Sequence, residues 1–229
     1  MSKVELSIII PSLREYENLK RIIPEIIKHL KKNMSYEILI IDGLTKDLKT
    51  FNFSKTFKNT KYLNRKGNNN YGNAVRLGIK KSVGRFIIFM DADYSHLPNF
   101  IPKLYKYRKY DIVIASRYVK GGNSDNNFFL KFLSRLLNFF YGFVLGLELN
   151  DISNSFRLYN SNILKKLKLK CNHFDIIEEI IFKFRIHNKK AIFKEIPYHF
   201  RERKFGKTKR NLLIIFAYLI SILKIRFFN

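Results

Sequence analysis

The sequence predicts an α/β fold built on a mostly parallel β-sheet. Short apolar runs that end at polar residues alternate with longer segments whose apolar residues recur at helical spacing. This alternation is typical of parallel strands connected by helices. The chain has 229 residues and is 46% hydrophobic, which is enough for one large domain with a sizeable core. Its aromatic content of 15% excludes a mainly disordered chain.

Each expected element is identified by its apolar pattern. Strands are predicted where short apolar runs end at polar or turn-forming residues, over residues 6–10, 38–41, 62–63, 86–90, 111–115 and 192–197. Helices are predicted where apolar residues recur every three to four positions, over residues 15–30, 73–81, 128–145, 160–169 and 174–187. Parallel strands place their carboxyl ends along one edge of the sheet, where ligands bind.

The end of the chain has a different composition. Residues 212–223 are almost entirely apolar until Lys224 and Arg226 follow, and this run is shorter than the roughly 20 residues that span a bilayer. We therefore expect a domain over residues 1–210. A C-terminal apolar and basic helix, residues 211–229, would associate with a membrane or pack on that domain.

The net charge of +26 has two explanations. Strongly basic proteins bind nucleic acid, anionic membrane surfaces or polyphosphate ligands. A genome rich in A and T would also produce a chain rich in Lys, Asn, Ile and Phe, so charge alone selects no partner. The single cysteine, Cys171, excludes a disulfide scaffold and a zinc site made of cysteines.

Polar residues follow four of the predicted strands directly. They are Pro11 and Ser12, then Asp42, then Asp91 and Asp93, and finally Ser116 and Arg117. Because strand carboxyl ends meet at one edge of a parallel sheet, these side chains are expected to share one site.

Asp91 and Asp93 are the strongest candidates for chemistry. In extended backbone, residues two apart point the same way, so both carboxylates can face one hard cation. Mg²⁺ or Mn²⁺ is held by one or two such carboxylates, with water and diphosphate oxygens completing the shell. The alternative is a structural turn, since Asp is common where strands end.

Two other acids and a basic segment carry weaker signals. Asp42 is either a turn residue or an acceptor for a base or ribose. Glu15 lies at the start of a predicted helix, where the helix dipole favours an acid in any case. Residues 200–209 combine five Arg and Lys side chains with Gly206 and Thr208, which suits either a solvated surface or phosphate capture.

The order of these pieces resembles the family-2 glycosyltransferases of the GT-A fold. Within that family it resembles the dolichol-phosphate mannosyltransferase group of polyprenyl-phosphate glycosyltransferases. The matching blocks lie at residues 8–19, 36–50, 72–78, 86–96, 111–122, 151–159 and 195–209. They include the sequences DAD, SRY and RKFGKTK in the family's order.

The resemblance implies a reaction. A sugar, with mannose or glucose expected, would move with inversion from a GDP- or UDP-sugar to a polyprenyl phosphate, with Mg²⁺ or Mn²⁺ as cofactor. A phosphate acceptor is already an anion at neutral pH and needs positioning more than a strong base. We expect peripheral attachment to the cytoplasmic face of a membrane and no nucleic-acid partner.

The resemblance also implies contacts to the donor. Those to the nucleotide sugar are Pro11, Ser12, Glu15, Asp42, Gly72 and Asp91. The cation would be held by Asp91 and Asp93, with Ser95 at the place of a third ligand. Arg203 and Lys209 would close over the diphosphate.

On the acceptor side, the resemblance assigns the phosphate to Arg117. The family's next helix carries an Arg four residues before a Ser. Here Ser134 follows Leu130 at that distance, which leaves Lys131 and Ser134 as the expected second contact. The implied catalytic set is Asp93, Arg117, Arg203 and Lys209.

Two other functions stay open at this point. A family-2 transferase with a saccharide hydroxyl as acceptor would need a carboxylate base, for which Asp151, Glu178 and Glu179 are candidates. A non-enzymatic basic protein that binds nucleic acid or acidic lipid would rest on the charge alone.

Overall fold

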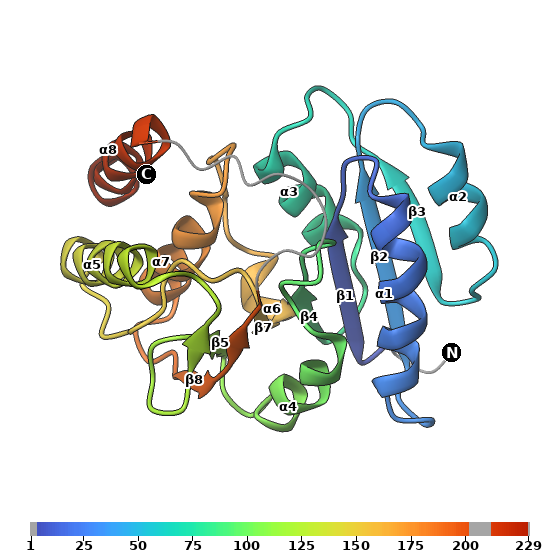
Figure 1. Cartoon of the computed structure of the whole chain (residues 1–229), viewed down its shortest axis with the longest axis horizontal. Coiled ribbons are helices and arrows are strands. Elements are labelled where there is room, and N and C mark those ends of the chain that lie inside the picture. Colours follow the sequence, from blue (N-terminus) through green and yellow to red (C-terminus); the bar gives the residue numbers. More distant parts are fainter. Residues whose placement is uncertain (1–3, 202–211, 229) are drawn as a thin grey trace.

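The structure is a computed structural model that describes residues 4–201 and 212–228 (Figure 1). Within these residues one sheet has the strand order β3-β2-β1-β4-β7-β5-β8. Every pairing in it is parallel except the two made by β7. The predicted mostly parallel α/β sheet is therefore confirmed. Its strands are β1 Leu6–Pro11, β2 Tyr36–Asp42, β3 Thr60–Asn64, β4 Phe86–Phe89, β5 Ile112–Ser116, β7 Arg157–Asn160 and β8 Phe193–Pro197.

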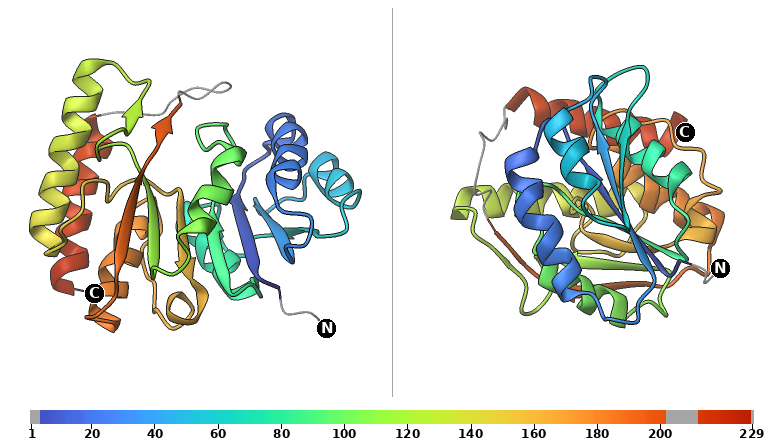
Figure 2. Two further views of the ribbon diagram at one scale, coloured as in Figure 1. Left: turned by 90° about the horizontal axis from the view of Figure 1, so that it is seen from below. Right: turned by 90° about the vertical axis from the view of Figure 1, so that its right-hand side faces the viewer.

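Helices cover both faces of this sheet (Figures 1 and 2). They are α1 Tyr16–His29, α2 Leu48–Ser54, α3 Tyr71–Lys81, α4 Ile101–Lys106, α5 Phe128–Leu145, α6 Ser161–Leu164, α7 Ile176–His187 and α8 Leu212–Phe228. The alternation along β1 shows the two layers, because Ile8 and Ile10 pack with α1 and α4, whereas Ile9 packs with α3 and α7. A separate parallel pair joins β6, Asn123–Ser124, to β9, His199–Phe200.

The predicted helix over residues 160–169 is wrong in length. Only α6, Ser161–Leu164, forms there. The backbone N–H groups of Lys170 and Cys171 instead donate to the carboxylate of Glu179 on α7, at 2.8 and 2.9 Å. The lysine-rich segment is thus tied to another helix rather than continuing its own.

Two long helices lie side by side at one end of the molecule. The views in Figures 1 and 2 agree that α5 and α8 are neighbours, and the two helices are in contact. Ile222 and Ile225 of α8 are buried in the core, and the hydroxyl of Ser221 donates to Asp175 at the start of α7. This end of α8 therefore packs on the domain.

Candidate active site

The carboxyl ends of β1, β2 and β4 are adjacent, because these strands are neighbours in the sheet. Ser12, Asp42 and Asp91 follow or end these strands at the same edge. In the described part of the chain, the non-glycine residues with positive φ are Arg14, at 58°, and Tyr94, at 67°. Both lie in the loops at this edge, and strained backbone of this kind is concentrated at functional sites.

Asp42 is buried and held by three hydrogen bonds. Its Oδ1 accepts from the backbone N–H groups of Arg14 and Gly43, at 3.1 and 2.8 Å, and its Oδ2 accepts from the Tyr62 hydroxyl at 3.0 Å. The carboxylate thereby fixes the loops after β1 and β2 against each other.

Arg65, which sequence reasoning missed, lies beneath the same loops. Its guanidinium donates to the carbonyl oxygens of Asp42 at 2.9 Å and Ser12 at 2.8 Å, and also to those of Asn69 and Asn70. Burial lowers the pKa of Arg65, and the nearby Asp42 only partly opposes that effect. Its position directly after β3 was the available sequence signal for a site residue. No local sequence pattern identifies its partner Ser12, which lies 53 residues away.

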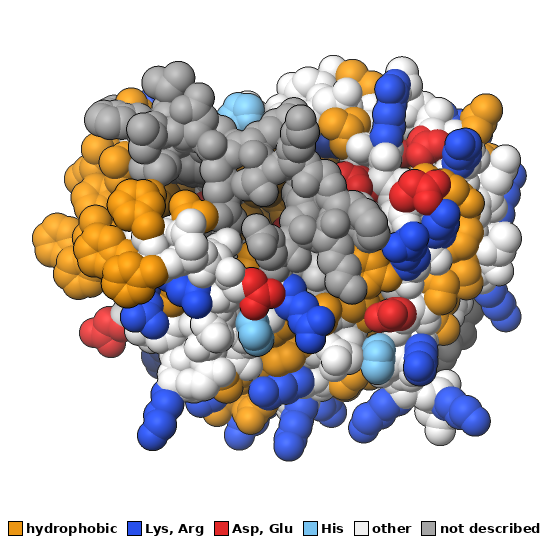
Figure 3. All heavy atoms as spheres, in the orientation of Figure 1, with side chains coloured by type: hydrophobic (Ala, Val, Ile, Leu, Met, Phe, Trp, Pro, Cys, Tyr) orange, Lys and Arg blue, Asp and Glu red, His pale blue; other side chains and the backbone are white. Residues whose placement is uncertain are grey.

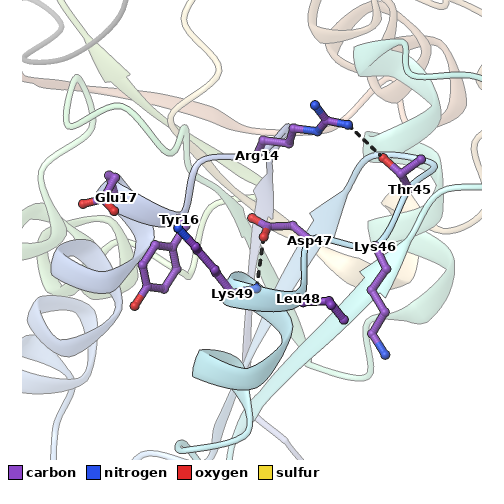
Figure 4. A pocket seen from close by; sticks show the side chains of 8 residues that line it. All are labelled: Arg14, Tyr16, Glu17, Thr45, Lys46, Asp47, Leu48 and Lys49. Carbon is purple, nitrogen blue, oxygen red and sulfur yellow. Dashed lines mark hydrogen bonds between the residues drawn. The ribbon is translucent and has the colours of Figure 1, made fainter.

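A pocket of about 520 Å³ lies between Arg14 and the segment of residues 45–49 (Figure 4). The loops after β1 and β2 form it, and Figure 4 shows Arg14 reaching across to Thr45, a contact of 3.4 Å. Lys46 and Lys49 also line it, and the carboxylates of Glu17 and Asp47 partly offset these positive charges. It is lined by Arg14, Tyr16, Glu17, Thr45, Lys46, Asp47, Leu48 and Lys49.

The other expected nucleotide contacts are Pro11, Ser12, Glu15 and Gly72, and their surroundings differ. Pro11 ends β1, and the buried Ser12 hydroxyl has no hydrogen-bond partner among the described residues. Glu15 precedes α1 and accepts from the Asn18 side chain at 2.7 Å. At Gly72 an added Cβ would lie 2.2 Å from the carbonyl oxygen of Cys171, so only glycine fits against that loop. These four roles remain predictions.

Asp91 and Asp93 follow β4 in a short turn. The Asp91 side chain is 27% exposed, and its Oδ2 accepts from the Ser155 hydroxyl at 3.3 Å. Asp93 is largely buried, and its Oδ1 accepts from the backbone N–H and the hydroxyl of Ser95, at 3.0 and 2.5 Å. Ser95 therefore supports Asp93 here, and its role as a cation ligand remains a prediction.

The donor set suits a hard cation with few protein ligands. Two carboxylates two residues apart, one of them accessible, match what Mg²⁺ or Mn²⁺ takes from a protein when diphosphate completes the shell. Within the described residues, no group of three His, Cys, Asp or Glu side chains is placed to hold a metal. Asp91 and Asp93 remain the predicted ligands of such an ion.

Arg117 follows β5 and forms a buried ion pair with Asp151. Its Nε and Nη2 donate to the two Asp151 oxygens at 2.8 and 2.7 Å, and its backbone N–H donates to Oδ2 at 2.8 Å. Burial alone would lower the pKa of Arg117, but the charge and hydrogen bonds of Asp151 outweigh it and raise that pKa. Arg117 stays cationic at every physiological pH.

A network links Arg117 to α5. Its Nη2 also donates to the Ser153 hydroxyl at 2.9 Å, and the buried Asn138 of α5 donates to the same hydroxyl at 3.1 Å. Asn138 in turn accepts from the backbone N–H groups of Ile152 and Ser153, at 2.7 and 2.9 Å. Sequence reasoning missed Asn138 and Ser153, which no local pattern distinguishes from surface residues.

The other residues predicted to contact the acceptor phosphate or the diphosphate are Lys131, Ser134, Arg203 and Lys209. Lys131, on α5, donates to the Asn123 side chain at 3.2 Å, and the Ser134 carbonyl accepts from Asn138 at 2.8 Å. Neither makes a contact with Arg117 in the described part of the chain, so their phosphate role stays a prediction. Arg203 and Lys209 lie outside the described residues.

The three candidate bases differ in their surroundings. Both oxygens of Asp151 are paired with Arg117, and Glu179 accepts from Lys183 at 2.7 Å besides the two backbone groups already described. Glu178 is buried, and its Oε2 has no hydrogen-bond partner among the described residues. Burial raises the pKa of Glu178 to about 8, so this carboxyl is mostly protonated at neutral pH.

Comparison with known proteins identifies the family. Residues 7–168 match the family model for glycosyl transferase family 2. A dolichol-phosphate mannosyltransferase of Pyrococcus furiosus is 30% identical over 231 residues, covering 97% of this chain and 64% of that protein. An undecaprenyl-phosphate 4-deoxy-4-formamido-L-arabinose transferase of an Enterobacter species is 30% identical over 232 residues, covering 93% and 66%. The chain thus spans just under two thirds of the length of these curated relatives.

Solved structures support the predicted GT-A fold. A glucosyl-3-phosphoglycerate synthase from Mycobacterium tuberculosis, in complex with Mn²⁺, UDP and glucosyl-3-phosphoglycerate, has a TM-score of 0.72 at 13% identity, covering 97% of this chain and 80% of that one. Its complex with Mg²⁺ and UDP has a TM-score of 0.70 at 14% identity, covering 96% and 79%. At these identities the likeness concerns the fold alone. Because the family model matches well over half of the chain and the relatives are 30% identical across nearly all of it, the chain belongs to glycosyl transferase family 2.

Proposed function

We propose that the protein transfers mannose or glucose from a GDP- or UDP-sugar to the phosphate of a polyprenol, with inversion at the anomeric carbon. The names of both curated relatives specify a polyprenyl phosphate, dolichol phosphate in one and undecaprenyl phosphate in the other. The observation that carries the proposal is the position of Arg117, a buried cation linked by hydrogen bonds to a helix with an exposed apolar face.

The donor would bind across the ends of β1, β2 and β4. Asp42, which orders the loop of Arg14, would accept from the base or ribose of the nucleoside. Asp91 and Asp93 would hold Mg²⁺ or Mn²⁺, which neutralises charge on the leaving diphosphate when it is bound. Arg203 and Lys209 are proposed to act on the same diphosphate.

Arg117 would orient the acceptor phosphate. Asp151 fixes the guanidinium through Nε and Nη2, and two fixed donors leave the planar group little freedom to rotate. A phosphate oxygen is already an anionic nucleophile, so the site needs no strong base.

The state of the candidate bases agrees with such an acceptor. Asp151 and Glu179 are already paired with cations, and Glu178 is mostly protonated at neutral pH. A saccharide hydroxyl would have to lose its proton to one of them. Among the described candidates, none offers an unpaired and ionised carboxylate for that step.

Helix α5 would bring the site to a membrane. Phe128, Phe132, Leu136, Phe139 and Phe143 recur at helical spacing, and each is more than half exposed. Figure 3 shows hydrophobic side chains gathered at this end of the molecule. A contiguous exposed apolar stripe marks a surface that contacts a protein or a membrane. We propose that it enters the interfacial region of a bilayer.

Attachment at the surface suits α5 better than crossing the bilayer. Among the described helices, α5 alone is long and apolar enough to cross a membrane by length and composition. Its opposite face, however, is part of the domain, because Asn138, Tyr141 and Leu145 are buried. A helix held in this way lies along the interface with its apolar face in the lipid. We propose that this membrane surface is the cytoplasmic one.

A transfer assay tests the proposed function. The purified full chain in detergent with Mn²⁺ is given GDP-mannose or UDP-glucose, together with undecaprenyl phosphate or undecaprenol. We expect glycolipid from the phosphate and none from the alcohol. Equal transfer to undecaprenol or to a soluble saccharide would favour the hydroxyl-acceptor function. A chain that neither transfers nor hydrolyses any nucleotide sugar would favour a non-enzymatic basic protein.

A further inference from the structure

His96 is a buried polar side chain beside the carboxylate pair. Its ring is 1% exposed and stacks on Phe156, with the ring centroids 4.6 Å apart and the planes at 10°. Phe200 packs edge-on against it at 6.2 Å. Nε2 has no hydrogen-bond partner among the described residues, and an orphaned polar atom in such a setting requires a physical explanation.

The hydrogen bond at the other ring nitrogen fixes the tautomer. The backbone N–H of Asp91 donates to Nδ1 at 2.9 Å, and a backbone N–H can only donate. Nδ1 therefore carries no proton, and the neutral ring carries its proton on Nε2. A protonated Nε2 is a donor and cannot coordinate a cation.

That donor lies close to the side chain of the same aspartate. Nε2 is 3.7 Å from Oδ2 of Asp91, about an ångström beyond a charge-assisted hydrogen bond. The Ser155 hydroxyl reaches the same Oδ2 at 3.3 Å, also a long contact. His96 and Ser155, from separate loops, thus converge on one oxygen of the carboxylate, and both distances are longer than a strong hydrogen bond.

We propose that His96 is a positioning residue for Asp91. Its Nε2–H, together with the Ser155 hydroxyl, would hold Oδ2 and so fix the plane of the carboxylate that would bind the cation. The Nδ1 contact fixes the ring to the Asp91 backbone, and Phe156 keeps the ring plane constant. Groups that orient a metal-binding carboxylate in this way change metal affinity by about 10- to 100-fold. The inference rests on the proposed function, since it requires a cation at Asp91.

Three variants of the full chain distinguish the roles of the two ring nitrogens. His96→Gln keeps a donor near the place of Nε2 and loses the acceptor at Nδ1. His96→Asn keeps an acceptor near Nδ1 and loses the distal donor. His96→Phe keeps the stacking on Phe156 and loses both. His187→Gln, at the exposed end of α7, is the matched control.

Binding of Mn²⁺ is the measurement, because a merely structural role would not change it selectively. The loss of the free Mn²⁺ electron paramagnetic resonance signal is followed with Mn²⁺ alone and with UDP or GDP, beside a thermal melt without metal. We expect His96→Asn and His96→Phe to bind Mn²⁺ about 10- to 100-fold more weakly, and His96→Gln and His187→Gln to stay within about threefold of wild type.

Several outcomes would overturn the inference. If His96→Asn binds as wild type does while His96→Gln does not, the contact to the Asp91 backbone is what matters. Equal affinity in all folded variants would remove His96 from the site. If the His96 variants fail to fold, Ser155→Ala tests the same oxygen, and unchanged Mn²⁺ affinity there contradicts the convergence on Oδ2. A wild-type chain that binds no Mn²⁺ contradicts the metal site of the proposed function itself.

Discussion

Arg117 and Asp151 form a two-point ion pair in the interior of the protein, with Nε and Nη2 of the arginine on separate oxygens of the carboxylate. The aspartate is fully buried and the arginine is 9% exposed. Removing one partner would leave an uncompensated buried charge, which costs about 3–5 kcal/mol. Any test of Arg117 as a phosphate ligand must therefore keep the charge.

Arg117→Lys is the corresponding change. Lysine retains the charge but cannot bind Asp151 at two points, so the cation is no longer oriented. We expect kcat/KM for the polyprenyl phosphate to fall by about 10- to 100-fold, equivalent to about 1.5–3 kcal/mol, while the Kd for the nucleotide changes less than twofold. The control is Arg108→Lys, after α4. Equal losses for donor and acceptor would reassign Arg117 to the diphosphate.

Asp93→Asn tests the carboxylate pair. The amide keeps the shape of the side chain and an acceptor for Ser95 but loses the charge that binds a cation. We expect the chain to stay folded and its turnover of nucleotide sugar to fall at least about 100-fold. Asp111→Asn, at the opposite edge of the sheet, should retain activity. Near-normal turnover of wild type in excess chelator would contradict metal dependence.

Glu178 gives the protein a pH-dependent stability. Burial raises its pKa from 4.5 to about 8 in the folded state. Between these values the unfolded chain has released a proton that the folded chain still holds, so the free energy of unfolding falls as pH rises, by up to about 1.4 kcal/mol per unit. The contribution of the protonated Glu178 carboxyl to the free energy of unfolding is complete below about pH 4.5 and lost above about pH 8.

Glu178→Gln replaces the titrating carboxyl by an amide and so removes its contribution to the pH dependence of stability. We expect the free energy of unfolding of the variant, relative to that of wild type, to rise between pH 5 and pH 8. Above pH 8 the difference between the two should stay constant. Urea unfolding at several pH values measures it, with the exposed Glu148→Gln as control. Parallel stability curves for wild type and variant would show that Glu178 is ionised in the folded protein.

Flotation with liposomes tests the apolar stripe of α5. Replacing Phe132 and Phe139 by Ser removes two exposed rings from that stripe. Each ring buried in lipid contributes about 1.5–3 kcal/mol, so binding should weaken at least tenfold. Val83→Ser with Ile186→Ser, on other surfaces, is the matched control. Binding that survives the Phe changes would assign membrane contact elsewhere, for example to the C-terminal segment.

The strand-end positions of the residues proposed to bind the donor follow closely from the sequence. Asp42, Asp91 and Asp93 end or follow parallel strands, and the apolar pattern alone identifies those strands. The sequence does not identify residues that act through long-range hydrogen bonds. Asn138 and His96 carry no local signal, and the position of Arg65 after β3 does not identify its partners, because only the folded chain brings those partners near.

The acceptor half is harder to predict because β7 runs against its neighbours. An antiparallel strand begins, rather than ends, at the edge where the site lies. The loop that precedes β7 therefore carries Asp151, Ser153 and Ser155. The strand-end pattern points only to residues that follow a strand. With only four residues, β7 also lacks a detectable alternation.

The reversed strand has a consequence for how such an enzyme changes its acceptor. β7 separates the sheet into a continuous parallel part, β3-β2-β1-β4, and a second part, β5-β8. Helix α5 lies at the same end of the molecule as this second part (Figures 1 and 2). The residues proposed to bind the donor come from the first part, whereas Arg117 and its network, proposed to bind the acceptor, come from the second. Exchange of α5 and the loops around β5 would replace the acceptor module and leave the nucleotide module intact. The boundary for building chimeric transferases on this scaffold is therefore β7.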